Sequence, residues 1–372
     1  MKLNIIVSLF LLLFMAGASI TFAADEGASE KDIESVVSAL KDLKFETLWY
    51  LSYQDGQQNN GTDYSKFTLK RGYLTVKKSI IPSLSARLTA DITQVNDADS
   101  NLNGSVAVRL KYLYGQFIFP ENEFLTNPNI EFGLVHIPWL DFEEHINFYR
   151  LQDTMFLERN HTFNSADMGI TFSTLLGGTI DKDYQTRVTK YYPGRYGSMA
   201  FGIYNGGGYH ASEKNNNKVF EGRLTIRPLP DTLPGLQLSY FGIFGKGNQS
   251  TNPDWETNLG FISYQHEFFT LTGQYYTGKG NQSGSNENEK KGHSVFAEIK
   301  PIEKISFIGR YDHFDPNKDA SNDENDRYIF GIAYMLDKPH HNMIVLDYDT
   351  VKYKQSDTKD DKRIQLTLQI KY

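Results

Sequence analysis

Short segments that alternate between apolar and polar residues run through most of the chain. The clearest is the last, in which one face carries Ile364, Leu366, Leu368, Ile370 and Tyr372 and the other carries Arg363, Gln365, Thr367, Gln369 and Lys371. Comparable apolar sets alternate at 328–336, at 344–348 and in Val106, Val108, Leu110, Tyr112 and Tyr114. A period of two places successive side chains on opposite faces of a strand, so each segment predicts a strand with one apolar and one polar face.

These segments predict an all-β chain of about sixteen strands. They fall at 45–54, 66–78, 83–95, 105–119, 129–137, 167–176, 197–206, 217–228, 235–246, 256–266, 268–279, 291–300, 303–314, 326–337, 341–352 and 362–372. Connections after even-numbered strands are mostly brief, whereas those after odd-numbered strands, such as 280–290 and 315–325, are longer and polar. This arrangement is typical of a transmembrane antiparallel β-barrel. Only 176–196 is too long for a plain turn, which leaves the strand boundaries there open.

The number of strands bears on function. A soluble antiparallel sandwich would alternate in the same way, so the spacing of the connections is what favours a barrel. A barrel of sixteen strands encloses an aqueous channel, whereas one of eight is filled by its own side chains. No segment after Ala23 is apolar for long enough to form a transmembrane helix. We therefore expect a channel through which small solutes pass passively.

The first 44 residues have a different pattern. Lys2, the apolar run 5–17 and the small-residue site ending at Ala23 predict a secretory signal peptide over 1–23. Residues 24–44 predict a short amphipathic periplasmic helix, with Ile33, Val36 and Leu40 at heptad positions. Two heptads are marginal alone, so this helix either packs against neighbouring protomers or the barrel mouth, or stays disordered. The barrel is then expected over 45–372.

Composition narrows the class of protein further. Aromatic residues make up 14% of a chain that is polar on average, as expected when one strand face meets lipid and the other meets water. Without Lys2, 37 bases stand against 45 acids, a net charge of −8 that argues against nucleic acid as a partner. There is no cysteine, which excludes disulfides and thiolate metal sites. No cofactor is implied.

Several stretches resemble the phosphate-selective porin O and P family. They are Phe67–Val76, Leu84–Asp91, Val108–Tyr114, Gly133–Pro138 leading through Phe142–Glu144 to Phe156–Arg159, then Asp167–Ile170, Tyr204–Gly207 and Glu221–Leu224. The resemblance implies a homotrimer of sixteen-stranded porin barrels in the bacterial outer membrane, in contact with lipid and lipopolysaccharide, whose third loop folds into the lumen. It also implies passage of small ions or solutes, with a possible preference for anions or phosphate.

One family feature is missing from the third loop. Between Leu140 and Asp167 the acids are Asp141, Glu143, Glu144, Asp153, Glu158 and Asp167, and the bases are Arg150 and Arg159. A phosphate filter built from many bases is not visible there, which leaves the charge preference open.

The alternation also gives candidates for the channel wall. Arg87, Arg109, Lys111, Arg223, Arg227 and Arg310 fall opposite lipid-facing residues and should point inward, while Arg71 lies in a strand whose two faces cannot be told apart. Such bases could guide anions, because charged rings set the selectivity of a pore. They could equally brace the wall by pairing with inward acids, for which the candidates are Asp91, Glu221, Asp312, Asp347 and Asp349.

The loop at about 138–166 is the candidate constriction. It contains large apolar side chains that would not stay exposed in water, namely Trp139, Phe142, Phe148, Tyr149, Met155, Phe156 and Leu157. If the loop folds inward, Arg150 and Arg159 face Glu143, Glu144 and Glu158 across the narrowest section. The alternative is an external loop that caps a trimer interface.

Other function classes have weaker support. His210 and Ser212 resemble part of a hydrolase site, but they lie in a glycine-rich loop without a scaffold, so an enzyme is not expected. The loop 315–326 has oxygen ligands at calcium-loop spacing but lacks the glycine that such a loop needs, so no metal site is assigned. A binding barrel, such as an adhesin or receptor, remains the alternative to a porin.

Overall fold

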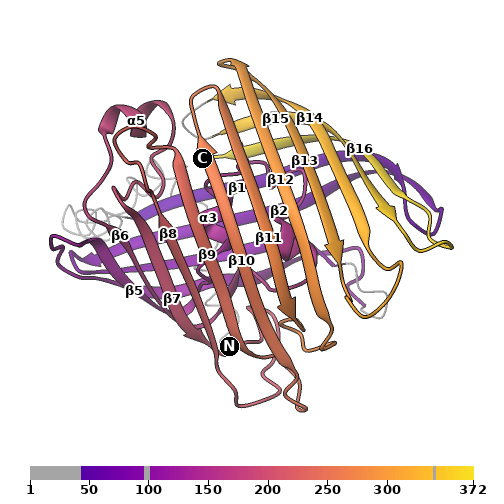
Figure 1. Cartoon of the computed structure of the whole chain (residues 1–372), viewed down its shortest axis with the longest axis horizontal. Coiled ribbons are helices and arrows are strands. Elements are labelled where there is room, and N and C mark those ends of the chain that lie inside the picture. Colours follow the sequence, from indigo (N-terminus) through magenta and orange to yellow (C-terminus); the bar gives the residue numbers. More distant parts are fainter. Residues whose placement is uncertain (1–42, 96–100, 338–340) are drawn as a thin grey trace, which may run out of the picture. The chain divides into compact units, whose positions relative to one another are not determined.

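The structure is a computed structural model and describes residues 43–95, 101–337 and 341–372. They form a closed antiparallel barrel of sixteen strands in which each strand pairs with its neighbours in the sequence and β1 pairs with β16 (Figure 1). The barrel closes where Thr47 N donates to Tyr372 O at 2.8 Å. The predicted fold class and strand number are therefore confirmed. The signal peptide over 1–23 and the helix over 24–44 lie outside the described residues, except that β1 already begins at Leu43.

The strand boundaries agree with the sequence pattern to within a few residues. The strands are β1 (Leu43–Gln57), β2 (Asp63–Ile81), β3 (Leu84–Gln94), β4 (Val106–Ile118), β5 (Leu125–His136), β6 (Ala166–Leu176), β7 (Gly197–Tyr204), β8 (Val219–Ile226), β9 (Leu236–Lys246), β10 (Asp254–Gln265), β11 (Phe269–Lys279), β12 (Glu289–Ile302), β13 (Ile305–Asp315), β14 (Asn325–Asp337), β15 (Asn342–Tyr353) and β16 (Asp361–Lys371). We call the end with the connections after odd-numbered strands the loop end, and the opposite end the turn end.

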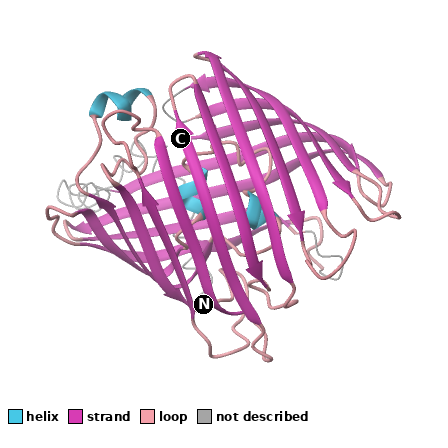
Figure 2. Ribbon diagram, in the orientation of Figure 1, coloured by secondary structure: helices cyan, strands magenta, loops and turns pink. Residues whose placement is uncertain are grey.

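Three short helices lie in two long connections (Figure 2). The inner loop (137–165) joins β5 to β6 and contains α3 (Leu140–Glu144) and α4 (Phe156–Arg159). The turn-end loop (177–196) joins β6 to β7 and contains α5 (Lys182–Arg187) and a single bridge between Thr179 and Gly194. Residues 177–196 were the segment whose strand boundaries were left open, and within the described residues they contain no further strand.

The two strand faces differ as the alternation predicts. On β14, for example, Phe330 and Ile332 are exposed on the outer surface while Ile329 and Ala333 are buried inside. The outer surface of the other strands is likewise rich in exposed Leu, Ile, Phe and Tyr side chains. No helix among the described residues is long and apolar enough to cross a membrane.

One predicted face is wrong. The sequence places Tyr112 and Tyr114 on the same outer face as Leu110, but both tyrosines are more than 90% buried and Leu113 between them is 50% exposed. The pairing between β3 and β4 shifts register at this point, so that Lys111 is an extra residue without a partner. Such a β-bulge exchanges the two faces of the strand beyond it, which turns both tyrosines inward.

A charge on the outer surface should be costly. Ile332 lies at the middle of β14 and is 48% exposed on the apolar face. Replacing Ile332 by Arg is expected to destabilise the barrel by about 2–4 kcal/mol in a bilayer, the cost of a basic residue at the lipid midplane. Reversible denaturant unfolding from lipid vesicles would measure it, with Ile332→Leu as the control. A cost equal to that of the Leu control would contradict the membrane-facing assignment.

Candidate channel and constriction

The inner loop packs against the inside of the barrel wall. Trp139 stacks on Phe241 of β9, with ring centroids 5.4 Å apart, and meets Phe261 of β10 edge to face at 5.2 Å. Phe156 meets Phe314 of β13 edge to face at 6.1 Å. The buried apolar cluster that they form contains Ile137, Trp139, Leu140, Phe142, Ile146, Met155, Phe156, Leu157, Phe163, Val219, Phe241, Ile243, Trp255, Leu259, Phe261, Tyr276 and Phe314. The loop therefore lies inside the barrel and is not an external cap, because its apolar side chains are buried against the inner face of β8 to β13.

A second cluster holds the tip of the loop against the adjoining part of the wall. Tyr149 and Leu151 pack among inward side chains of β1 and of β12 to β15. The Tyr149 hydroxyl donates to Glu298 of β12 at 2.6 Å. Lys70 of β2 donates to the carbonyl oxygens of Leu151 and Gln152, both at 2.6 Å. The loop therefore spans the barrel interior and is anchored on both sides.

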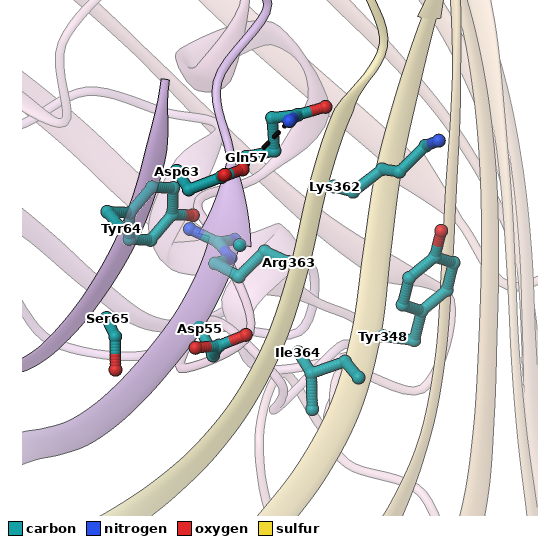
Figure 3. A pocket seen from close by; sticks show the side chains of 10 residues that line it. Asp55, Gln57, Asp63, Tyr64, Ser65, Tyr348, Lys362, Arg363 and Ile364 are labelled. Carbon is teal, nitrogen blue, oxygen red and sulfur yellow. Dashed lines mark hydrogen bonds between the residues drawn. The ribbon is translucent and has the colours of Figure 1, made fainter. Parts of the chain in front are cut away.

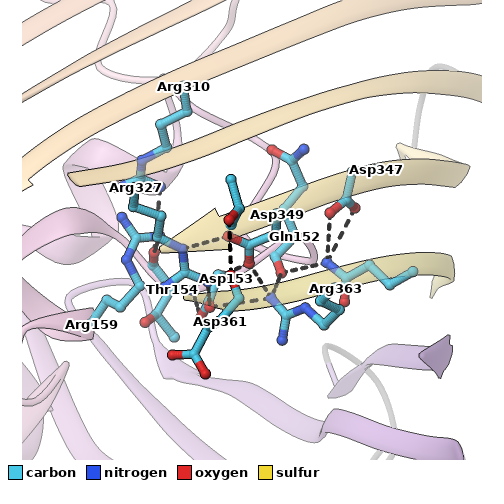
Figure 4. A network of polar contacts seen from close by, with 12 residues as sticks. Gln152, Asp153, Thr154, Arg159, Arg310, Arg327, Asp347, Asp349, Asp361 and Arg363 are labelled. Atoms are coloured by element: carbon cyan, nitrogen blue, oxygen red, sulfur yellow. Dashed lines mark hydrogen bonds and ion pairs between the residues drawn. The ribbon is translucent and has the colours of Figure 1, made fainter. Parts of the chain in front are cut away.

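An ion-pair network fastens the tip, and we call it the latch: Asp153, Arg327, Asp349 and Arg363 (Figure 4). Arg327 of β14 pairs with both Asp153 of the loop and Asp349 of β15. Arg363 of β16 lies 2.5 Å from Asp349 and 3.4 Å from Asp153. Asp349 is almost fully buried and the guanidinium groups are mostly so. Two arginines thus neutralise two carboxylates that could not remain buried alone.

A third anchor lies beside the latch. Arg159 of α4 pairs with Asp312 of β13, and Arg310 of the same strand also reaches Asp312, at 3.1 Å. Arg310 in addition donates to the carbonyl oxygen of Thr154 at 3.4 Å. Arg159 and Arg310 therefore brace the loop through Asp312, and Arg159 does not face Glu143 or Glu144.

The latch should respond to acid. Burial alone would raise the pKa of Asp153, which lies in the inner loop outside the spanning strands, but Arg327 and Arg363 outweigh it and hold that pKa well below its usual range. A carboxyl with a lowered folded pKa stabilises the protein above its ordinary pKa of about 4, and this contribution is lost as the pH falls toward the folded value. We expect steady single-channel current at pH 7 and pH 5 and larger, fluctuating current near pH 3. An Asp153→Asn chain should fluctuate at all three pH values; a pH-independent native current would contradict the latch.

The other acids of the inner loop also have ion-pair or hydrogen-bond partners. Glu144 and Glu158 both pair with Arg150, Glu158 at 2.7 Å. Glu143 is buried and accepts hydrogen bonds from Trp139 Nε1 at 2.7 Å and from Gln274 at 2.8 Å. Arg150 thus meets Glu144 and Glu158 as the sequence suggests, while Glu143 points into the wall. Asp141 accepts a hydrogen bond from Tyr192, lies 3.4 Å from His145 and keeps 37% of its side chain exposed. Each acid of the loop therefore has a local partner, and Asp141 also lines open space.

The opposite part of the wall is basic, and we call it the basic wall: Arg71 of β2, Arg87 of β3, and Arg109 and Lys111 of β4. Asp91 of β3 accepts from Arg109 at 2.8 Å and from Arg71 at 3.2 Å. No acid pairs with Arg87 or Lys111 among the residues that the structure describes. Within this set four bases stand against one acid, an excess of three positive charges, while Lys70 and Lys77 of β2 are engaged with the inner loop and with Glu46.

Aromatic rings hold the bases of this wall in place. Lys111 Nζ donates to the Tyr73 hydroxyl at 2.7 Å and lies 4.4 Å from the centre of that ring. The guanidinium of Arg87 lies 4.7 Å from the ring centre of Tyr112, one of the two tyrosines that the bulge turns inward. Such cation–π contacts orient a base without neutralising its charge.

The ten charged residues that the sequence suggests for the channel wall and the constriction differ in how far their side chains are exposed. Asp91 is fully buried, whereas the side chains of Arg71 and Arg109 are 18% and 36% exposed. Arg87 also keeps part of its surface exposed. Arg223 and Arg227 are buried braces: Arg223 donates to Pro138 O at 2.9 Å and Arg227 to Gly194 O at 2.7 Å. Lys111, Arg150 and Glu143 are buried too, and Glu144 and Arg159 are engaged in the pairs described above.

Two further features lie outside the basic wall and the inner loop. A hollow of about 570 Å³ near the loop end is lined mostly by polar residues of β1, β2 and β16, among them Arg363 of the latch, together with Tyr348 and Ile364 (Figure 3). In the loop 205–218, the ring of His210 packs on Tyr209 and the carbonyl oxygen of Ser212 accepts from Asn248. These contacts give neither residue the geometry of a hydrolase pair.

The loop 315–326 also lacks the arrangement of a calcium site. Asp326 accepts from His313 at 2.9 Å and from Tyr311 at 2.8 Å, while Asp315 lies 3.4 Å from Lys291. The described residues contain no group of three or more His, Asp or Glu side chains placed to hold a metal ion.

Several residues of the site were not singled out from the sequence. Lys70, Arg327 and Arg363 fasten the inner loop, and Tyr73 and Tyr112 orient the basic wall. Arg363 belongs to the polar face of a clearly alternating strand, so its inward direction could be read from the pattern. Its partner in a loop 210 residues away could not.

The described residues therefore define a sixteen-stranded transmembrane β-barrel narrowed by an inner loop. Comparison with protein-family models and with curated protein sequences finds no match. Solved structures do match in fold. The anion-selective porin from Comamonas acidovorans has a TM-score of 0.60 and 11% identity over 89% of this chain and 99% of that one. OmpF of Salmonella typhi, in complex with daunomycin, has a TM-score of 0.58 and 10% identity over 89% and 97%.

A third similar structure is the outer-membrane channel DcaP of Acinetobacter baumannii, with a TM-score of 0.55 and 11% identity over 89% of this chain and 97% of that one. At such low identity these likenesses establish the shared barrel fold only. The function of this chain has to be argued from its own residues.

Proposed function

We propose that this chain is a porin of the bacterial outer membrane through which small hydrophilic solutes diffuse passively, with a preference for anions. The observation that carries the proposal is the asymmetry of the channel interior. The acids of the inner loop are paired or buried, whereas the basic wall exposes Arg71, Arg87 and Arg109 and has an excess of three positive charges. The low-dielectric wall of a channel focuses the electric field of such charges, which raises the local concentration of anions.

The finer parts of the proposal rest on the resemblance. Phosphate as a preferred anion, a homotrimer and contact with lipopolysaccharide are properties that the phosphate-selective porin O and P family implies. Export by a signal peptide over 1–23 follows from the sequence pattern. Because outer-membrane barrels have short periplasmic turns and longer extracellular loops, the loop end of this barrel would face the exterior and the turn end the periplasm.

Swelling of proteoliposomes tests the passive channel. Vesicles that contain the folded protein are diluted into isosmotic solutions of sugars of increasing size, and the rate of swelling is recorded by light scattering. A porin gives rates that fall steeply with solute size, while vesicles with heat-denatured protein do not swell. An absence of swelling with folded protein would exclude the porin and favour a binding barrel.

A further inference from the structure

The turn-end loop (177–196) is far longer than the other connections at its end of the barrel, such as the two residues between β12 and β13. Its base is closed by the bridge between Thr179 and Gly194. The Tyr184 hydroxyl of α5 donates to Gln265 O at 2.9 Å, and Arg187 lies 3.2 Å from Glu267. These contacts fasten α5 to the turn between β10 and β11, so the loop is a fixed part of the barrel mouth.

The second half of this loop returns to the inner loop. The Tyr192 hydroxyl donates to Asp141 of α3 at 2.5 Å, and the Tyr192 ring meets Phe142 edge to face at 5.0 Å. The neighbouring Tyr191 ring lies 4.0 Å from that of His145. The two loops, which enter from opposite ends of the barrel, are therefore in direct contact.

Tyr192 is held in an unusual backbone conformation. Its φ of 47° lies in the left-handed region, which a non-glycine residue adopts only where the surroundings hold it. Arg227 of the wall donates to its carbonyl oxygen at 3.4 Å and to that of Gly194 at 2.7 Å. The guanidinium of Arg223 lies 4.2 Å from the ring centre of Phe142 and 5.2 Å from that of Tyr192. Wall, inner loop and turn-end loop thus meet at one point.

Open space lies against both loops. A cavity of about 320 Å³ is lined by Asp141 and Pro138 of the inner loop, by Tyr192 of the turn-end loop and by Arg87 of the basic wall. Another, of about 700 Å³, is lined by Phe148 and Tyr149 of the inner loop and by 185–191 of the turn-end loop. Each cavity is bounded by residues of both loops, so the contact between the loops borders the space that a solute would cross.

We propose that the turn-end loop forms the second half of the constriction, and that the rings of Tyr191 and Tyr192, set against His145 and Phe142, fix the size limit for solutes. This rests on the proposed porin function. The tyrosines contribute bulk and no charge, whereas the basic wall contributes charge. Size and charge selection are then assigned to different parts of the channel.

Removal of the two rings tests the proposal. In a Tyr191→Ala, Tyr192→Gly chain the glycine suits the left-handed backbone at 192, so the loop can keep its course. The single-channel conductance is expected to rise roughly twofold or more while the reversal potential in a salt gradient stays the same. Tyr196→Ala is the matched control, because Tyr196 lies in the same loop, over Gly177, and is 53% exposed.

Thiol labelling gives a second measurement that does not depend on a double substitution. The chain has no cysteine, so Tyr191→Cys introduces a single reactive site. A bulky methanethiosulfonate reagent is expected to reduce the current through this chain and to leave that of Tyr196→Cys unchanged. If the native chain conducts but neither measurement changes its current, the turn-end loop is not part of the constriction. If the native chain does not conduct at all, the porin function itself is wrong.

Discussion

Replacement of Arg71, Arg87 and Arg109 by glutamate is expected to turn an anion-preferring channel into a cation-preferring one. The basic wall has four bases and one acid, and the triple change leaves one base and four acids, so its net charge goes from +3 to −3. Because these are the wall bases that keep exposed surface, the field in the open space should change sign with them. The reversal potential in a KCl gradient measures the change.

Asp91 needs a separate control in this experiment. It is buried and loses both of its cationic partners in the triple variant, keeping only the hydrogen bond from the Tyr209 hydroxyl, which could impair folding. Arg87→Glu alone leaves Asp91 paired and should still move the reversal potential toward the cation side. Arg195→Glu makes the same charge change at the exposed pair with Asp231 and should leave the potential unchanged. Anion preference in the triple variant would contradict the role of the wall.

Opening the latch is expected to have the largest effect on the inner loop. Arg327→Ala together with Arg363→Ala leaves Asp153 and Asp349 without their cationic partners, and breaking a mostly buried pair costs about 3–5 kcal/mol. The tip of the loop should then leave the wall, which gives a larger and noisier single-channel current and a lower unfolding temperature. Arg327→Lys keeps a positive charge and should behave more like the native chain. A native current in the double variant would show that the apolar clusters hold the loop without the latch.

The barrel could be predicted from the sequence because its determinants are local. A period of two, repeated with short and long connections in turn, requires only neighbouring residues, and it places all sixteen strands to within a few residues. The exception is β4, where the bulge at Lys111 exchanges the two faces. A bulge leaves the composition of the strand unchanged, so alternation alone cannot detect it.

The site was predictable only in part, because its contacts join distant segments. Alternation suggests which bases point inward, but it cannot tell Arg109, which stays partly exposed, from Arg223, which is buried under the start of the inner loop. Likewise, the acids of the inner loop suggest a cation filter until the partners of Glu144 and Asp153 are known. Those partners depend on the path of the loop, which follows from tertiary packing.

Zero-current potential in a planar bilayer is the measurement that tests the central claim most directly. The folded chain is inserted between solutions of high and low KCl, and the potential at which the current vanishes is read for single channels. Steady conductance is expected, with a zero-current potential whose sign shows that chloride permeates more readily than potassium. A cation-selective potential would contradict control by the basic wall, and a folded barrel that carries no current would contradict the porin itself.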